Sequence, residues 1–158
     1  MDSNRILPLL LTVFLANAGT PLSSLEPYVG HWRLEDTDRV RHLRWGLEQR
    51  VLHVETLAGD RLVSQGAFFW NPLKQQIEGR SVHTDAAMDF DASAVLVTPD
   101  GLQIDRVGVS TIGERLILRE IWRIDATELV TEGRWLRGAG DNPAWRQTWR
   151  PTAHPDDG

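Results

Sequence analysis

The chain has 158 residues, 41% of them hydrophobic and 25% charged, which is typical of one soluble globular domain with its own core. Its formal net charge of -5 gives no basic excess that would favour binding to nucleic acid or to an anionic membrane. The absence of cysteine excludes disulfides, thiol catalysis, thiolate metal sites and a lipid anchor on an N-terminal cysteine.

Residues 1–18 have the pattern of a secretory signal peptide. Arg5 provides a short positive region, the apolar stretch from Ile6 to Leu15 follows it, and Ala16-Asn17-Ala18 offers small residues for cleavage before Gly19. The apolar stretch is too short for a spanning helix, although a buried helix or a membrane anchor is the alternative. We expect export to a bacterial periplasm or secretion, with no stable membrane insertion after cleavage.

Most of residues 19–151 are expected to form strands. A short helical turn is expected within residues 21–29, where Ser23 or Ser24 can cap it and Pro27 limits it. Short alternating segments then recur about every ten residues, separated by turn residues such as Pro99-Asp100-Gly101. The expected strands are Gly30–Glu35, His42–Trp45, Arg50–Leu57, Arg61–Trp70, Gln76–Thr84, Met88–Thr98, Leu102–Thr111, Arg115–Ile124, Glu128–Leu136 and Trp145–Arg150.

The region from Val40 to Val54 fits two patterns. Its apolar residues recur at helical spacings of three and four, but Gly46 in the middle costs a helix about 1 kcal/mol relative to alanine. Its β-branched residues favour strands. We predict two strands with a turn near residues 46–49.

These elements predict an all-β fold with one domain. Even strand spacing and hairpin turns indicate a single antiparallel up-and-down barrel of about 8–10 strands over residues 19–151, after a short helical turn. Residues 152–158 are expected to form a polar, frayed tail.

The start of this barrel resembles that of a known group of proteins. Residues 25–33, with Gly30 and Trp32, resemble the short turn and Gly-x-Trp that open lipocalin and fatty-acid-binding (calycin) barrels. Farther on, Trp45-Gly46-Leu47 and Phe69-Trp70-Asn71-Pro72 resemble uncharacterised lipocalin-like proteins of bacterial periplasms. The resemblance implies that Trp32 packs against an arginine of the last strand, either Arg146 or Arg150. Glycines of the haem-binding nitrobindin pattern are missing, so no cofactor is expected.

Catalytic motifs are absent from the sequence. It has no Gly-x-Ser-x-Gly nucleophile motif, phosphate loop or dinucleotide fingerprint, and its five histidines lack metal-binding spacing. His83 with Asp85, Asp89 and Asp91 is the densest polar cluster, which we interpret as a solvated strand face. We therefore assign no catalytic residue and no metal ligand.

One charged residue interrupts a strongly apolar strand face. Glu120 alternates with Leu118 and Trp122, so in this register a carboxylate points into the barrel. A slip of one residue would place Arg119 and Arg123 inside instead, and the sequence does not decide between the two registers. The expected ligand-binding residues are Trp70, Glu120, Trp122, Trp135 and Trp149.

Three functions fit this fold. The first is a non-enzymatic binder of a small hydrophobic or amphipathic molecule in the barrel lumen. The second is a lumenal acid–base enzyme of the isomerase or hydrolase type that uses Glu120 or a histidine, either His53 or His83. The third is an interaction module with a filled barrel.

Overall fold

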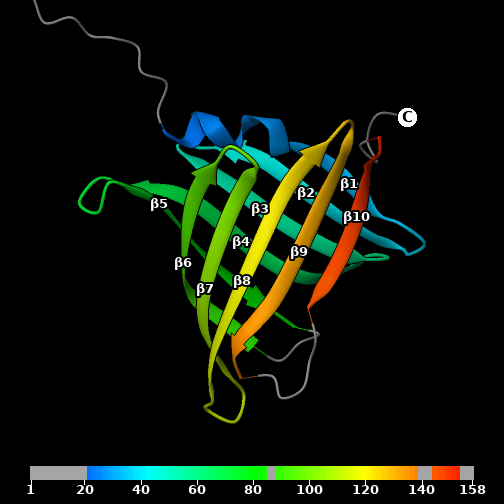
Figure 1. Ribbon diagram of the computed structural model, residues 1–158. Helices are drawn as coiled ribbons and strands as arrows, with labels where there is room; N and C mark the ends of the chain where they lie inside the picture. The colour runs from blue at the N-terminus through cyan, green and yellow to red at the C-terminus, as the bar shows by residue number, and fades with distance from the viewer. Residues whose placement is uncertain (1–20, 85–87, 139–143, 154–158) are drawn as a thin grey trace, which may run out of the picture.

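The computed structural model is a closed antiparallel barrel of ten strands (Figure 1). Each strand pairs with the next in sequence, and β1 closes the barrel against β10. The predicted all-β, up-and-down barrel is therefore confirmed. The elements are η1 (Pro21–Tyr28), β1 (Gly30–Leu34), β2 (Arg39–Gly46), β3 (Val51–Ala58), β4 (Arg61–Asn71), β5 (Gln76–His83), β6 (Met88–Thr98), β7 (Gly101–Ser110), β8 (Arg115–Asp125), β9 (Glu128–Arg137) and β10 (Trp145–Pro151).

The structure describes residues 21–84, 88–138 and 144–153, with the backbone alone for 88–92. The predicted signal peptide lies outside these residues, as do Asp85 and the side chains of Asp89 and Asp91. No helix within the described part of the chain is long and apolar enough to cross a membrane.

The ambiguous region between Val40 and Val54 forms two strands, as predicted. β2 and β3 form a hairpin in which Gly46 pairs with Val51, and the turn between them spans residues 47–50. Leu47, Glu48 and Gln49 all have positive φ angles, of 47°, 54° and 66°. A left-handed backbone is unfavourable for residues other than glycine, so cross-strand pairing determines this hairpin rather than local turn preference.

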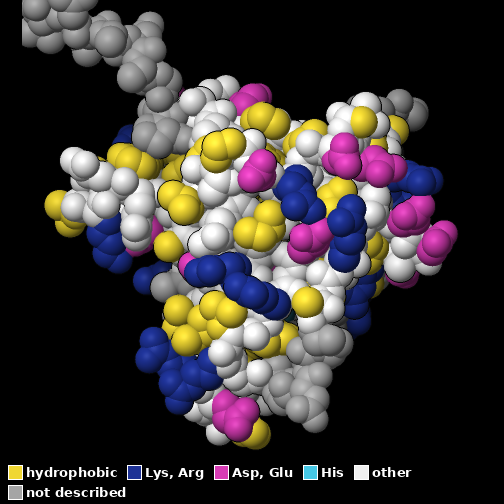
Figure 2. All heavy atoms as spheres, viewed as in Figure 1, with side chains coloured by type: hydrophobic (Ala, Val, Ile, Leu, Met, Phe, Trp, Pro, Cys, Tyr) yellow, Lys and Arg dark blue, Asp and Glu magenta, His cyan; other side chains and the backbone are white. Residues whose placement is uncertain are grey.

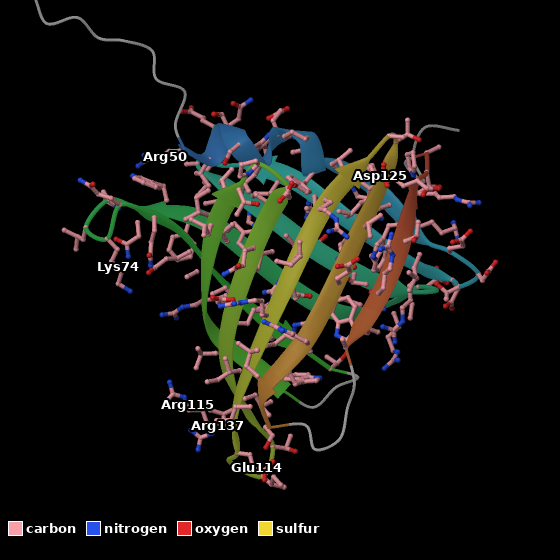
Figure 3. The ribbon with its side chains drawn as sticks, viewed as in Figure 1. Arg50, Lys74, Glu114, Arg115, Asp125 and Arg137 are labelled. Carbon is pink, nitrogen blue, oxygen red and sulfur yellow. The ribbon has the colours of Figure 1, made fainter. Side chains whose placement is uncertain are left out.

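A 3-10 helix closes one end of the barrel, which we call the cap end (Figure 1). The three residues per turn of this helix place Leu22, Leu25 and Tyr28 on one face, and all three are buried in the core. The Tyr28 hydroxyl donates to the Trp122 carbonyl oxygen at 3.1 Å. Figure 3 shows Asp125 near this end, and Glu114, Arg115 and Arg137 at the opposite end, which we call the far end.

Alternation of side chains along the strands, clearest on β8, separates the lumen from the outer surface. On β8, the buried residues Leu116, Leu118, Glu120 and Trp122 alternate with more exposed ones. The structure thus has the register in which Glu120 points inward. Most inward side chains are apolar and form the core, which includes the face of η1. A smaller set of inward side chains, among them Arg106 and Glu120, is polar, and we call this set the polar layer of the lumen.

Candidate functional site

The polar layer of the lumen surrounds a cavity of about 60 Å³. Strands from around the barrel line it, because β2, β3, β4, β5, β7 and β8 each contribute inward side chains. Its polar lining includes Arg41, Thr56, Ser81, His83, Arg106 and Glu120, and its apolar lining includes Phe68, Leu118 and Trp122. The cavity therefore joins charged groups to aromatic rings inside the barrel.

Arg106 and Glu120 form a buried ion pair at this cavity. Arg106 Nε donates to Glu120 Oε2, and both side chains are only 9% exposed. Arg106 Nη1 also donates to Ser81 Oγ at 3.3 Å and to Ser93 Oγ at 3.4 Å. Such pairing and hydrogen bonding are what a buried charge requires, so these two charges balance each other.

Arg41 brings a second positive charge into the same layer. Its Cζ lies 4.1 Å from the centre of the Trp149 ring and 5.0 Å from that of Trp122, in cation–π geometry. Its Nε donates to Thr56 Oγ1 at 3.4 Å. Burial lowers the pKa of Arg41 to about 10, and the nearby Glu120 carboxylate opposes this change. Arg41 is therefore still charged at neutral pH.

Two donors beside the cavity have no hydrogen-bond acceptor among the described residues. They are Arg41 Nη1 and Trp122 Nε1, and both atoms are fully buried. Buried donors are normally satisfied, because each unsatisfied one costs about 1–3 kcal/mol. Both orphaned groups are donors, so the partner that would satisfy them is an acceptor.

The structure distributes the four predicted ligand-binding tryptophans over different levels of the barrel. Trp122 lines the cavity, and Trp149 lies in the core, where its Nε1 donates to Thr131 Oγ1 at 3.1 Å. Trp70 is half-buried and packs against the core near the cap end. Trp135 is half-buried opposite Leu118. Of these four, Trp122 and Trp149 lie around Arg41.

The calycin resemblance implies structural roles for Gly30, Trp32, Arg146 and Arg150. Trp32 lies inside the barrel wall, whereas the two arginines lie outside it. Trp32 is buried in the core next to Gly30, and its Nε1 donates to the Tyr28 carbonyl oxygen at 2.9 Å. Arg146 and Arg150 point outward, where Arg146 pairs with Glu132, and Arg150 with Glu35 and Glu128. The arginine that lies against tryptophan rings in the lumen is Arg41, which belongs to β2 and not to the last strand.

Sequence reasoning missed Arg41 and Arg106. Both continue an apolar alternation: Arg41 precedes Leu43 and Trp45, and Arg106 follows Leu102 and Ile104. This is the same signal that identified Glu120, a charge in place of an apolar residue on an inward face. Applied to β2 and β7, it would have identified Arg41 and Arg106 as well.

The histidines proposed for the enzymatic alternative lie on different sides of the wall. His83 lines the cavity, with its Nε2 at 3.2 Å from Ser81 Oγ. His53 alternates with the inward residues Leu52 and Val54, and so lies on the outer face next to Gly46. Within the described part of the chain, no group of three or more His, Cys, Asp or Glu side chains could hold a metal ion.

Two comparisons with known proteins found no relative of this chain. No protein-family model matches the chain, and a search of curated proteins found no match either. The closed antiparallel barrel with its 3-10 cap is consistent with a calycin-like fold.

Proposed function

We propose that the protein is a non-enzymatic binding protein whose lumen holds the acidic group of a small organic anion. The observation that carries this proposal is the pair of orphaned donors, Arg41 Nη1 and Trp122 Nε1, beside one cavity. A carboxylate accepts hydrogen bonds through both oxygens and can therefore satisfy both donors.

The charge of the layer supports an anion. Arg41 and Arg106 contribute two positive charges and Glu120 one negative charge, which leaves one positive charge without a counterion among these three residues. A charge in a low-dielectric site attracts an opposite charge far more strongly than in water. The sign of the ligand should therefore be negative.

The size of the cavity supports a small ligand. Its volume of about 60 Å³ is far below the roughly 300–1,000 Å³ of pockets that enclose drug-sized molecules. An acid with two or three carbons is a better match than a long-chain fatty acid, whose tail would have to displace the packed core. Each non-hydrogen atom of a small ligand contributes at most about -1.5 kcal/mol, so acetate would bind no more tightly than tens of micromolar.

The other two functions have less support. In the enzymatic alternative, Glu120 or a histidine would be the acid or base. Glu120 Oε2 already accepts from Arg106, so this oxygen is engaged in an ion pair. A filled interaction module would not need an inward arginine whose buried Nη1 has no hydrogen-bond acceptor among the described residues.

The proposal includes the export inferred from residues 1–18. We infer that the mature barrel works outside the cytoplasm, as a periplasmic or secreted lipocalin-like protein. The small acid would then reach it from the extracytoplasmic solution.

Calorimetric titration tests the proposed function. We expect saturable binding of acetate and propionate, weaker binding of octanoate, and none of propylamine. Arg41→Met should abolish binding, because it removes the charge and every N–H donor of the guanidinium but retains an unbranched apolar side chain. Arg44→Met is the matched control, because Arg44 lies on the same strand but is exposed on the outer face. Equal binding by wild type and Arg41→Met, or preference for the amine, would refute the proposal.

A further inference from the structure

The outer wall of the barrel carries a second feature, separate from the lumen. An open groove of about 500 Å³ crosses β7, β8, β9 and β10, with Arg119, Arg134 and Arg146 in its lining. Figure 2 shows Lys and Arg side chains in a band across this face of the molecule. The groove is much larger than the lumen cavity and opens to solvent.

Among the residues that the structure describes, positive charge exceeds negative charge around this groove. Arg119 makes two hydrogen bonds to Asp105, Nε to Oδ1 at 2.7 Å and Nη2 to Oδ2 at 2.8 Å. A single oxygen, Glu132 Oε1, accepts from both Arg123 at 2.6 Å and Arg146 at 2.7 Å. Two carboxylates thus serve three arginines before Arg134 is considered, although the whole chain carries a net charge of -5.

Arg134 adds a further positive charge that no carboxylate of the described residues neutralises. Its side chain is exposed and lies directly opposite Arg119 on the neighbouring strand. No ion pair joins Arg134 to an acidic side chain among the described residues. Like charges in directly opposite positions destabilise a sheet, and a bound anion would remove that repulsion.

The strand register sets the spacing between Arg134 and Arg146. Arg146 pairs with Glu132, and Arg134 lies two residues farther along β9, so Arg134 and Arg146 are diagonal neighbours. Diagonal neighbours in a sheet are about 7–8 Å apart. Alternate side chains of an extended peptide point the same way and are about 7 Å apart. Acidic residues at alternate positions of an extended peptide therefore match this pair of arginines.

We propose that this groove binds an extended acidic peptide segment of a partner protein, with carboxylates at alternate positions. Ile121 and Ala144 provide apolar surface in the same groove for the peptide's neighbouring side chains. A closed barrel has no free strand edge, so recognition must be through side chains rather than through an added strand. This site goes beyond the proposed function and uses none of its residues.

Fluorescence polarisation tests the proposal with a fluorescein-labelled peptide, Gly-Ser-Glu-Ile-Glu-Ser-Gly. We expect saturable binding that weakens at least tenfold in Arg134→Gln and as salt rises, because exposed charges are screened. Arg61→Gln is the matched control, because Arg61 is an exposed arginine at the start of β4. Arg41→Met should leave this binding unchanged, which separates the two sites.

Peptide controls test the spacing. Replacing both glutamates by glutamine should abolish binding, and a peptide with two adjacent glutamates should bind several-fold more weakly. The proposal is wrong if the alternating peptide shows no saturable binding, if Arg61→Gln weakens binding as much as Arg134→Gln, or if the adjacent-glutamate peptide binds equally well.

Discussion

Arg41 links stability and binding at the scale of single residues. Burial of its guanidinium disfavours the charged form, as the lowering of its pKa to about 10 indicates, while the rings of Trp122 and Trp149 compensate in part. Proteins commonly retain such unfavourable groups where function requires them. The free energy that burial of the Arg41 charge costs the free protein is therefore what we expect of a residue retained to bind an anion.

Arg41→Met should therefore stabilise the free protein. We expect the free energy of unfolding to increase by about 1–2 kcal/mol, because an incompletely paired charge in the lumen is replaced by an unbranched apolar side chain. Urea denaturation without added carboxylate measures this change. Arg44→Met, on the outer face, should change stability by less than about 0.5 kcal/mol. A marked loss of stability in Arg41→Met would show that the cation is structural.

Tyr28 predicts a dependence of stability on alkaline pH. Burial raises the pKa of Tyr28 above its usual value of 10.0, and a hydrogen bond with the Leu102 backbone opposes this in part. The unfolded chain therefore loses the proton first, so the stabilising contribution is complete below pH 10 and declines as pH rises through the folded pKa.

The measurement compares wild type with Tyr28→Phe. The difference in unfolding free energy between them should narrow or reverse in favour of phenylalanine between pH 9 and pH 11. Arg41 contributes equally in both proteins and cancels in the comparison. A constant difference over this range would contradict the burial of the hydroxyl.

At the scale of elements, the 3-10 helix η1 acts as a plug and not as a linker. Leu25 is fully buried and Leu22 is only 3% exposed. The helix itself has little intrinsic stability, because it is short, of the 3-10 type, and contains Pro27. Its stability must come from packing onto the strand ends, where Trp32 and Trp122 meet it through hydrogen bonds with Tyr28.

Leu25→Ala should destabilise the whole barrel. We expect a loss of about 2–5 kcal/mol, because the substitution leaves a cavity beneath the cap. Ser23→Ala, on the exposed side of the same helix, should change stability by less than about 0.5 kcal/mol. Thermal unfolding followed by tryptophan fluorescence distinguishes the two. Similar small effects of both substitutions would mean that η1 is not part of the folded core.

Strand alternation made most of the fold predictable from the sequence. The grouping of side chains in the lumen could not be predicted in this way, because it depends on how the strands pair. The alternation of Leu118, Glu120 and Trp122 indicated one inward face, but sequence could not choose the register because a slip of one residue exchanges the faces. Arg41 and Arg106 are 65 positions apart in sequence, and only closure of the barrel brings them to one cavity. The outer groove depends in the same way on the pairing of β9 with β8 and β10.

At the scale of the whole molecule, the barrel closes by pairing of the first strand with the last. β1 pairs with β2 and with β10, so the barrel cannot close until nearly the whole chain is available. Such long-range pairing slows folding. The signal peptide that we infer for residues 1–18 is a separate proposal about the same molecule.

Mass spectrometry tests that inference on protein produced with its full N-terminal sequence in a bacterial host. The mature protein recovered from the periplasm should begin near Gly19. A chain that still carries residues 6–15 would contradict export by cleavage and favour a retained N-terminal segment.

In the proposed function, Arg41 and Trp122 together donate to an acidic group in the lumen. Nitrogen-15 NMR of the indole groups tests it directly, with the Trp122 resonance assigned by its loss in Trp122→Phe. Addition of propionate should shift the Trp122 Nε1–H resonance saturably in the wild-type protein and leave it unmoved in Arg41→Met. An unmoved Trp122 resonance in the wild type, or an equal shift in Arg41→Met, would contradict binding of the acid between these two residues.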